Sequence, residues 1–228
     1  MSGKLIVIEG TDGTGKETQT KNLIARLGDS NVHVATMSFP RYEEHWGRII
    51  KEDYLSGRNR DIYENDPWLP SNLYALDREC ASYKLREWLS DDIHVILDRF
   101  TESNLAYQGA KLSGNERTGF IKRLTYYENN ILNIPVADYV LYLDLPLEET
   151  VKIIKDRIAE AKALGEEYKD IHEEDIDFRR RVRDTYLELA SERNNWVTIN
   201  CMKSPEERLT REDVSALVWN QTSKWLNL

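Results

Sequence analysis

The sequence predicts a single α/β domain in which a five-stranded parallel sheet is covered by helices on both faces. Two observations indicate this fold. Short runs of consecutive apolar residues, typical of strands buried on both sides, recur along the chain. Longer segments with helical spacing of apolar residues separate these runs, as in chains that build a parallel sheet from strand–helix–strand units. A hydrophobic fraction of 40% supplies a core, and no internal repeat or low-complexity linker divides the 228 residues.

The first expected strand is the apolar run 5–8, and a glycine-rich turn and a helix start follow it directly. Gly10, Gly15 and Lys16 fit the phosphate-binding pattern G-x-x-x-x-G-K-[ST] except at its last position, which is Glu17. Glycines let successive backbone N–H groups point into one concavity, and the helix N-terminus adds partial positive charge. Lys16 would supply a full charge for the β- and γ-phosphates of a nucleotide. The rest of this phosphate-binding stretch is Thr11, Asp12, Gly13, Thr14 and Thr18.

Glu17 is the departure from the pattern. The usual Ser or Thr hydroxyl at this position is a ligand of Mg²⁺. A carboxylate is also a hard oxygen ligand, so Glu17 could hold the ion directly or through water, although it adds negative charge beside the phosphates. Thr18 is one residue too late on the helix to substitute for the missing hydroxyl.

The next expected elements are a strand within 31–39 and a helix over 42–56, with Arg41 between them. An arginine at the exit of this strand could hold an anion at the carboxyl edge of the sheet, or could be a solvated surface residue.

A long helix is predicted over 68–89, entered through two prolines. Tyr74 and Arg78 lie four residues apart on one face of it. Such a pair could stack on a base and bind its edge, or could simply pack with the charge at the surface.

The third expected strand is 94–97, and Asp98 and Arg99 come at its carboxyl end. A carboxylate in this place matches the second acidic element of phosphate-loop enzymes, which holds Mg²⁺ or its water. The alternative is a helix-capping aspartate followed by a surface arginine.

The remaining chain continues the alternation of helices and strands. We expect helices over 101–112 and 116–132, a strand over 139–143 and a helix after Asp144. The helical periodicity fails within the acidic segment 156–177, which is either a solvated face or a mobile lid that closes over bound phosphates. A helix over 178–194, a strand over 196–199 and a closing helix over 211–226 complete the prediction.

The formal net charge of −9 argues against a nucleic-acid polymer as partner, since such a partner needs a basic face. A mononucleotide needs only a few placed cations. No apolar run approaches the length of a membrane span, and the first strand begins too early to leave room for a signal peptide. Cys80 and Cys201 are expected to be reduced and structural, and no Cys/His cluster has zinc spacing. We therefore expect a cytoplasmic protein with no membrane partner.

The chain resembles the thymidylate kinase family of the phosphate-loop nucleoside-monophosphate kinases over about residues 3–226. The resemblance rests on five stretches: IEGTDGTGKETQT at 8–20, FPRY at 39–42, YALDR at 74–78, DRFTESNLAYQGAK at 98–111 and YLDLP at 142–146. It implies phosphoryl transfer from ATP to dTMP with Mg²⁺, giving ADP and dTDP, by a protein that is usually a homodimer. The faces of 42–56 and 68–89 are candidates for its interface.

The resemblance also implies roles for single residues. Lys16 and the loop backbone would bind the ATP phosphates, and Asp12 would approach the deoxyribose. Arg41 and Arg99 would clamp the dTMP phosphate, and Asp98, with Glu17, would serve the metal. Tyr74 would stack on thymine and Arg78 would bond its edge. Four further residues would line the acceptor site: Ser103, Asn104, Tyr107 and Gln108.

Gly13 stands where some members of the family carry an arginine. Members with glycine there resemble the type whose catalytic cation comes from the lid. Arg157 is then the first candidate for this cation, ahead of Lys162 and Lys169. A nucleotide-binding protein that has lost catalysis, suggested by Glu17, and a kinase for another nucleoside or nucleoside monophosphate remain the alternatives.

Overall fold

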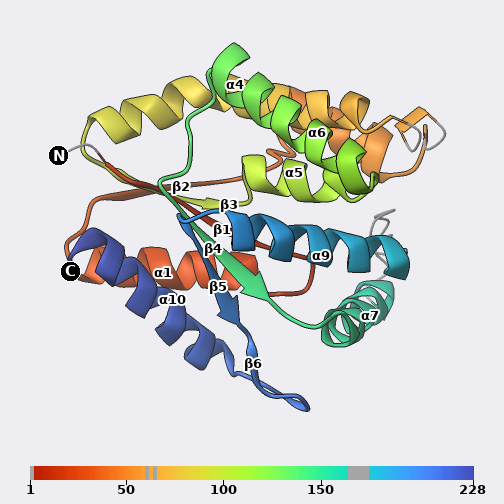
Figure 1. The fold of residues 1–228 in the computed structure, drawn as a ribbon. Helices are drawn as coiled ribbons and strands as arrows, with labels where there is room; N and C mark the ends of the chain where they lie inside the picture. The colour runs from red at the N-terminus through yellow and green to blue at the C-terminus, as the bar shows by residue number, and fades with distance from the viewer. Residues whose placement is uncertain (1–2, 60–61, 64–65, 164–174) are drawn as a thin grey trace.

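A computed structural model describes residues 3–59, 62–63, 66–163 and 175–228. Its centre is a five-stranded sheet in the order β2-β3-β1-β4-β5 (Figure 1). The strands are β1 (Leu5–Gly10), β2 (Val34–Ser38), β3 (His94–Asp98), β4 (Tyr139–Asp144) and β5 (Trp196–Asn200). All four neighbouring pairs are parallel, so the carboxyl ends of the strands meet at one edge. The predicted fold class is therefore confirmed.

The two faces of the sheet carry separate hydrophobic cores. Leu5 and Val7 of β1 face one core, while Ile6 and Ile8 face the other, as the alternation of side chains along a strand requires. The first core is covered by α4 (Trp68–Ser90), α5 (Thr101–Gly109), α6 (Gly114–Tyr126) and α9 (Ile176–Glu192). The second is covered by α1 (Lys16–Asp29) and α10 (Arg211–Leu226), which lie on the opposite side in Figure 1.

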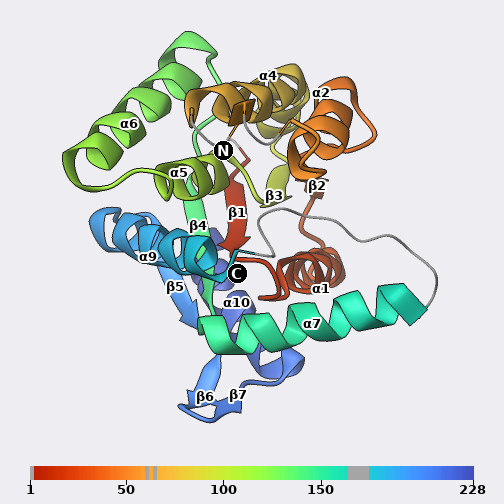
Figure 2. The same cartoon turned by 90° about the vertical axis from the view of Figure 1, so that its right-hand side faces the viewer.

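The helix α7 (Leu147–Ala163) follows β4 at the carboxyl edge of the sheet. Figure 2 looks toward this edge and shows α7 beside α1. A Cβ placed on Gly13 would lie 3.4 Å from the Thr150 carbonyl oxygen and 3.6 Å from Ile153. The first half of α7 therefore packs directly on the phosphate-binding loop.

Four regions differ from the expected elements. The segment 42–56 is a short helix α2 (His45–Ile49) that continues as a π-helix over Ile50–Leu55, and a second π-helix, Tyr127–Ile131, follows α6. A small hairpin of β6 (Met202–Ser204) and β7 (Glu207–Arg208) was not predicted. The regular helix α7 runs on to Ala163, past the point where periodicity fails in the sequence, and residues 164–174 of the expected lid, including Lys169, lie outside the described residues.

Among the described helices, none combines the length and the apolar character that crossing a membrane requires.

Candidate active site

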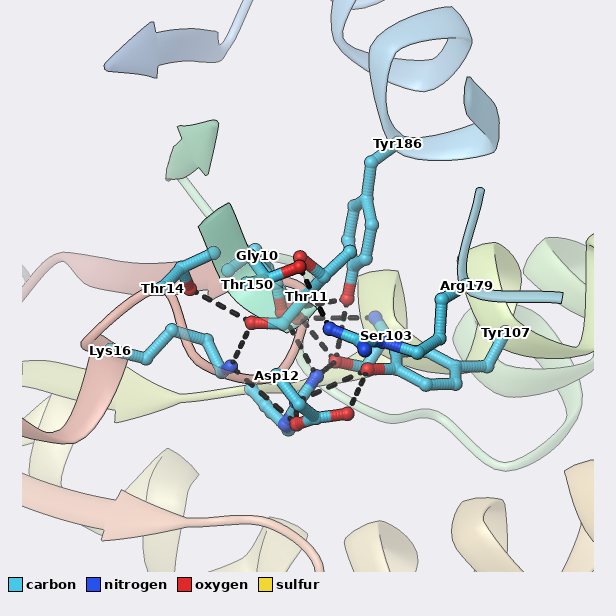
Figure 3. Close-up of polar contacts among 12 residues, drawn as sticks. Gly10, Thr11, Asp12, Thr14, Lys16, Ser103, Tyr107, Thr150, Arg179 and Tyr186 are labelled. Carbon is cyan, nitrogen blue, oxygen red and sulfur yellow. Dashed lines mark hydrogen bonds and ion pairs between the residues drawn. The ribbon is translucent and has the colours of Figure 1, made fainter. Parts of the chain in front are cut away.

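The phosphate-binding loop joins β1 to α1, and two of its glycines hold backbone conformations that side chains disfavour. Gly13 and Gly15 have φ of 88° and 87°. The Lys16 Nζ donates to the Thr11 carbonyl oxygen at 2.9 Å, and the Thr14 hydroxyl donates to the same oxygen at 2.9 Å (Figure 3). Burial lowers the pKa of Lys16 to about 8, and the nearby Arg99 adds to this effect. A buried cation next to glycine amides is a site for anionic phosphate.

An open cleft runs along this loop, and the exposed Arg157 of α7 lies in its wall. The residues that line it are Asp12, Gly13, Gly15, Lys16, Glu17, Thr18, Thr20, Lys21, Ile24, Thr36, Ser38, Phe39, Pro40, Tyr42, Asp98, Arg99 and Arg157. Glu17 accepts a hydrogen bond from Lys21 Nζ at 2.5 Å; this bond, with the charges of Lys21 and Arg157, lowers the pKa of the Glu17 carboxyl. The structure thus brings Glu17 and Arg157 to the same cleft as Lys16.

Three acidic residues stand at the carboxyl ends of neighbouring strands, and only one of them lines this cleft. Glu9 is fully buried and accepts from the Phe100 and Ser103 amides at 2.9 and 3.1 Å. Asp144 accepts a fork of two hydrogen bonds from Arg183 at 2.8 and 2.9 Å. Asp98 borders the cleft, where burial raises its pKa and the charge of Lys16 opposes that rise. Of these three carboxylates, the half-buried Asp98 is therefore the one placed to meet a cation that accompanies phosphate.

Arg99 lies between the loop and α5 with a left-handed backbone, φ 64°. Its Nη1 donates to the Gly10 carbonyl oxygen at 3.2 Å and to Ser103 Oγ at 3.1 Å. Its Nη2 pairs with Asp12, whose other carboxylate oxygen accepts from the Tyr107 hydroxyl at 2.7 Å. Figure 3 shows Asp12, Tyr107 and Ser103 gathered at this point. The guanidinium group is thus held by an internal anion at the mouth of the loop.

A second cavity opens on the other side of Arg99, enclosing about 530 Å³ that includes space open to solvent. Its walls are formed by Asp12, Phe39, Pro40, Tyr42, Leu55, Tyr74, Arg78, Arg99, Phe100, Ser103, Asn104, Tyr107 and Gln108. It shares five of these residues with the phosphate cleft: Asp12, Phe39, Pro40, Tyr42 and Arg99. The two spaces therefore meet, and a group in one can reach a group in the other.

The far end of this cavity combines an aromatic ring with polar groups. Tyr74 and Arg78 of α4 both line it, as their spacing predicts. Arg78 is nevertheless almost fully buried, and its guanidinium group pairs with the Glu128 carboxylate at 2.7 Å, which offsets the cost of burying the charge. Gln108 is 1% exposed, and neither polar atom of its amide has a partner among the described residues. Buried polar atoms of this kind are costly unless a ligand or water binds them.

Arg41 is one of the two arginines expected to clamp the acceptor phosphate, and its side chain pairs with Asp77. Its backbone N–H and its Nε donate to the Asp77 carboxylate at 2.8 and 3.1 Å, and its Nη2 donates to the Asp77 carbonyl oxygen at 2.7 Å. Arg41 lines neither the cleft nor the cavity, whereas the next residue, Tyr42, lines both. Asp77 thus engages the side chain of Arg41, whereas Asp12 engages that of Arg99.

Several residues of the site were not predicted from the sequence. Glu9 supports the start of α5 and also accepts from Ser103 Oγ at 2.7 Å and from the Tyr186 hydroxyl at 2.8 Å. The sequence offers one indication of Glu9, because it is an acidic residue at the end of the otherwise apolar run 5–8. Tyr42 and Glu128 carry no local signal, since their partners in the site lie far away in the chain.

Comparison with known proteins identifies the family. A family model described as thymidylate kinase matches residues 8–212. The chain is 28% identical over 206 residues to a thymidylate kinase of Mycobacterium tuberculosis, an alignment that covers 88% of this chain and 93% of the relative. It is 30% identical over 223 residues to a probable thymidylate kinase of Pyrococcus abyssi, with 96% and 97% covered.

The solved structure of a thymidylate kinase from Candida albicans shares the fold. It superposes with a TM-score of 0.70 at 21% identity, covering 99% of this chain and 93% of the other. The family match and the relatives agree. The chain belongs to the thymidylate kinase family, whose members are nucleoside-monophosphate kinases that phosphorylate dTMP.

Proposed function

We propose that this protein transfers the γ-phosphoryl group of ATP to the 5′-phosphate of dTMP, giving ADP and dTDP, and that the phosphate cleft holds ATP while the cavity holds dTMP. One observation carries this assignment of the two spaces. The cleft around Lys16 and the cavity beside Tyr74 share a wall that contains Asp12 and Arg99. The γ-phosphoryl group and the acceptor phosphate would meet at that wall.

The chemistry needs alignment and charge neutralisation more than proton transfer. The acceptor phosphate is already a nucleophile at neutral pH, so no general base is required. Lys16 and the loop amides would bind the ATP phosphates, and Arg157 would approach the transferred group from α7. Arg99 would bind the acceptor phosphate once this phosphate replaces Asp12 as its partner. Asp12 would then be released toward the deoxyribose.

Mg²⁺ fits the residues present. The ion usually binds through one or two carboxylates together with substrate phosphates and water, so it does not need a cage of several acidic side chains. Asp98 borders the cleft next to Lys16, and Glu17 lines the same space. These two carboxylates would hold the ion, which when bound neutralises the β- and γ-phosphate charge.

The cavity end that carries Tyr74 would bind the base. Tyr74 would stack on thymine, while Arg78, Asn104 and Gln108 would meet its polar edge, and Ser103 and Tyr107 would lie nearer the sugar and phosphate. Nothing in the comparisons supports a binding protein that has lost catalysis or a kinase for another nucleotide.

We also propose a cytoplasmic homodimer. The support is the family resemblance together with apolar side chains exposed on α4, where Tyr83 is 74% and Leu69 38% exposed. Such a dimer would bury this face of α4 against a second copy.

The direct test measures ADP release with ATP, Mg²⁺ and one of dTMP, dCMP, dGMP or dAMP. We expect the largest kcat/KM with dTMP. Equal turnover with all four acceptors, or none with any, contradicts the proposed reaction. A protein that binds ATP but turns over only as Glu17→Thr supports the lost-catalysis alternative.

A further inference from the structure

Glu128 is a buried carboxylate that lies behind the base end of the cavity without lining it. It is 1% exposed and belongs to the π-helix Tyr127–Ile131. Its Oε2 accepts from Arg78 Nε at 2.8 Å, and its Oε1 accepts from Arg78 Nη2 at 2.7 Å. The same Oε1 accepts from Asn104 Nδ2 at 2.8 Å. One carboxylate therefore holds two residues that do line the cavity.

These contacts fix which end of the Asn104 amide faces the ligand. Asn104 Nδ2 donates to the Ser71 carbonyl oxygen at 3.1 Å as well as to Glu128. Both partners are acceptors, so the amide nitrogen must point toward them and the oxygen away from them. Asn104 Oδ1 is buried and has no hydrogen-bond partner among the described residues, while Asn104 lines the cavity. Asn104 thus offers the ligand an acceptor.

Arg78 offers the opposite polarity next to this acceptor. Arg78 Nε and Nη2 both donate to Glu128, and Arg78 Nη1 makes a long contact of 3.4 Å to the Phe100 carbonyl oxygen. A guanidinium group has five N–H donors and no acceptor, so donors remain for the cavity that Arg78 lines. The two-point contact with Glu128 also fixes the plane of the group.

A donor beside an acceptor matches the edge of a pyrimidine with an oxygen at C4 and a hydrogen on N3. Cytosine presents the reverse pattern, an amino group at C4 and an unprotonated N3. We propose that Glu128 is a positioning residue that sets this polarity, and that it thereby makes the cavity select a 4-oxo pyrimidine over a 4-amino pyrimidine. This inference rests on the proposed function of the cavity as the acceptor site.

The test substitutes Glu128→Gln, which preserves shape but replaces one acceptor oxygen with an NH₂ donor. At the Oε2 position that donor faces Arg78 Nε, and at the Oε1 position it faces both Arg78 Nη2 and Asn104 Nδ2. Either placement sets donor against donor, so Arg78 or Asn104 has to turn away. If Asn104 turns, it also gives up its hydrogen bond to the Ser71 carbonyl oxygen, and its nitrogen then faces the cavity and accommodates N3 of cytosine. We expect the ratio of kcat/KM for dTMP to that for dCMP to fall about tenfold or more, with the KM for ATP unchanged.

The matched control is Glu188→Gln, because Glu188 also pairs with an arginine, Arg117 at 2.9 Å, but lies outside both the cleft and the cavity. It should keep the wild-type ratio. Glu128→Asp retains the buried charge but is one methylene too short to hold Arg78 and Asn104 together. It should fold even if Glu128→Gln does not, and should lower the ratio by a smaller factor.

A role limited to neutralising Arg78 predicts a different result. A loss of activity that is proportional for dTMP and dCMP, or a wild-type ratio in the folded Glu128 variants, overturns the inference. If the wild-type protein does not phosphorylate dTMP, the proposed function fails on its own. In that case the ratio of the dissociation constants of dTMP and dCMP, measured by calorimetric titration of the wild-type protein and the same variants, decides whether Glu128 controls the preference for a 4-oxo pyrimidine.

Discussion

Lys16 is a charged residue that the fold buries at a cost in stability. Its pKa of about 8 lies below the ordinary value of 10.5 because burial disfavours the charged form. Lys16→Met keeps the length and removes the charge. We expect kcat to fall at least about 10²-fold, since a preorganised cation facing the transferred phosphate is lost.

The free energy of unfolding of Lys16→Met should stay equal or rise, because methionine carries no desolvation penalty. A coupled ADP assay and urea unfolding measure the two effects. The exposed Lys122→Met serves as control and should change neither. A variant that loses activity only because it unfolds would contradict the assignment.

Glu102 of α5 is a buried carboxyl whose Oε2 has no partner among the described residues. Burial, reinforced by the charge of Glu9, raises its pKa from 4.5 to about 7. The folded protein therefore keeps this proton between about pH 4.5 and 7, where the unfolded chain has released it. This group's contribution makes stability fall as pH rises through that window, by an amount on the order of 3 kcal/mol.

Glu102→Gln removes the titration. We expect it to raise the free energy of unfolding at pH 8 by about 1–3 kcal/mol and to flatten the profile between pH 5 and 8. Urea unfolding at several pH values measures this, with the exposed Glu116→Gln as control. An unchanged slope in Glu102→Gln would show that another group titrates.

At the scale of the element, α7 brings Arg157 to the phosphate cleft, which Lys21 of α1 and Arg99 also line. Thr150, Ile153 and Arg157 are spaced three and four residues apart, so they share the face that packs toward Gly13 and the cleft. Arg157→Ala should lower kcat by about 10³-fold, the low end of what an arginine contributes to phosphoryl transfer.

The KM for dTMP should change little in Arg157→Ala, because the residue does not line the acceptor cavity. Lys162→Ala is the control: it removes a cation from the same helix that lies outside the cleft lining. If Lys162→Ala costs as much kcat as Arg157→Ala, the effect belongs to the net charge of α7 and not to the position of Arg157.

Elements were predictable where their signal is local. The apolar runs placed β3 and β4 to within one residue of their ends and β1 to within two, because strands buried on both faces need continuous apolar side chains. The π-helices Ile50–Leu55 and Tyr127–Ile131 were not predictable, since a single wider turn leaves the apolar spacing of a helix nearly unchanged. The hairpin of β6 and β7 is short and mostly polar, so it has no apolar run to reveal it.

At the scale of the whole molecule, the site depends on pairings between distant residues. Asp77 engages Arg41 across 36 residues, and Glu128 engages Arg78 across 50. The motif and the strand ends indicated Lys16, Asp98 and Arg99, because each follows an element that is visible in the sequence. Glu128, which orients Arg78, and Asp77, which binds Arg41, can be identified as partners only when the helices are packed.

The proposed dimer is tested through Tyr83, the most exposed large apolar side chain of α4. Tyr83→Asp places a charge on this face, and burial of that charge between two copies is unfavourable. Sedimentation equilibrium should show a dimer for the wild-type protein and a shift toward monomer for Tyr83→Asp. The control variant Tyr83→Phe, which keeps an apolar ring at this position, should remain dimeric. A wild-type protein that sediments as a monomer rules the proposal out.

The pairing of Arg99 with Asp12 has a consequence for molecules that lack a phosphate. The Asp12 carboxylate neutralises the Arg99 guanidinium group. An incoming nucleotide would therefore need a phosphate to replace Asp12 as the partner of this group. Thymidine offers none and would leave the internal ion pair closed. If Arg99 binds the acceptor phosphate as we propose, this exchange of one anion for another would select against an unphosphorylated nucleoside.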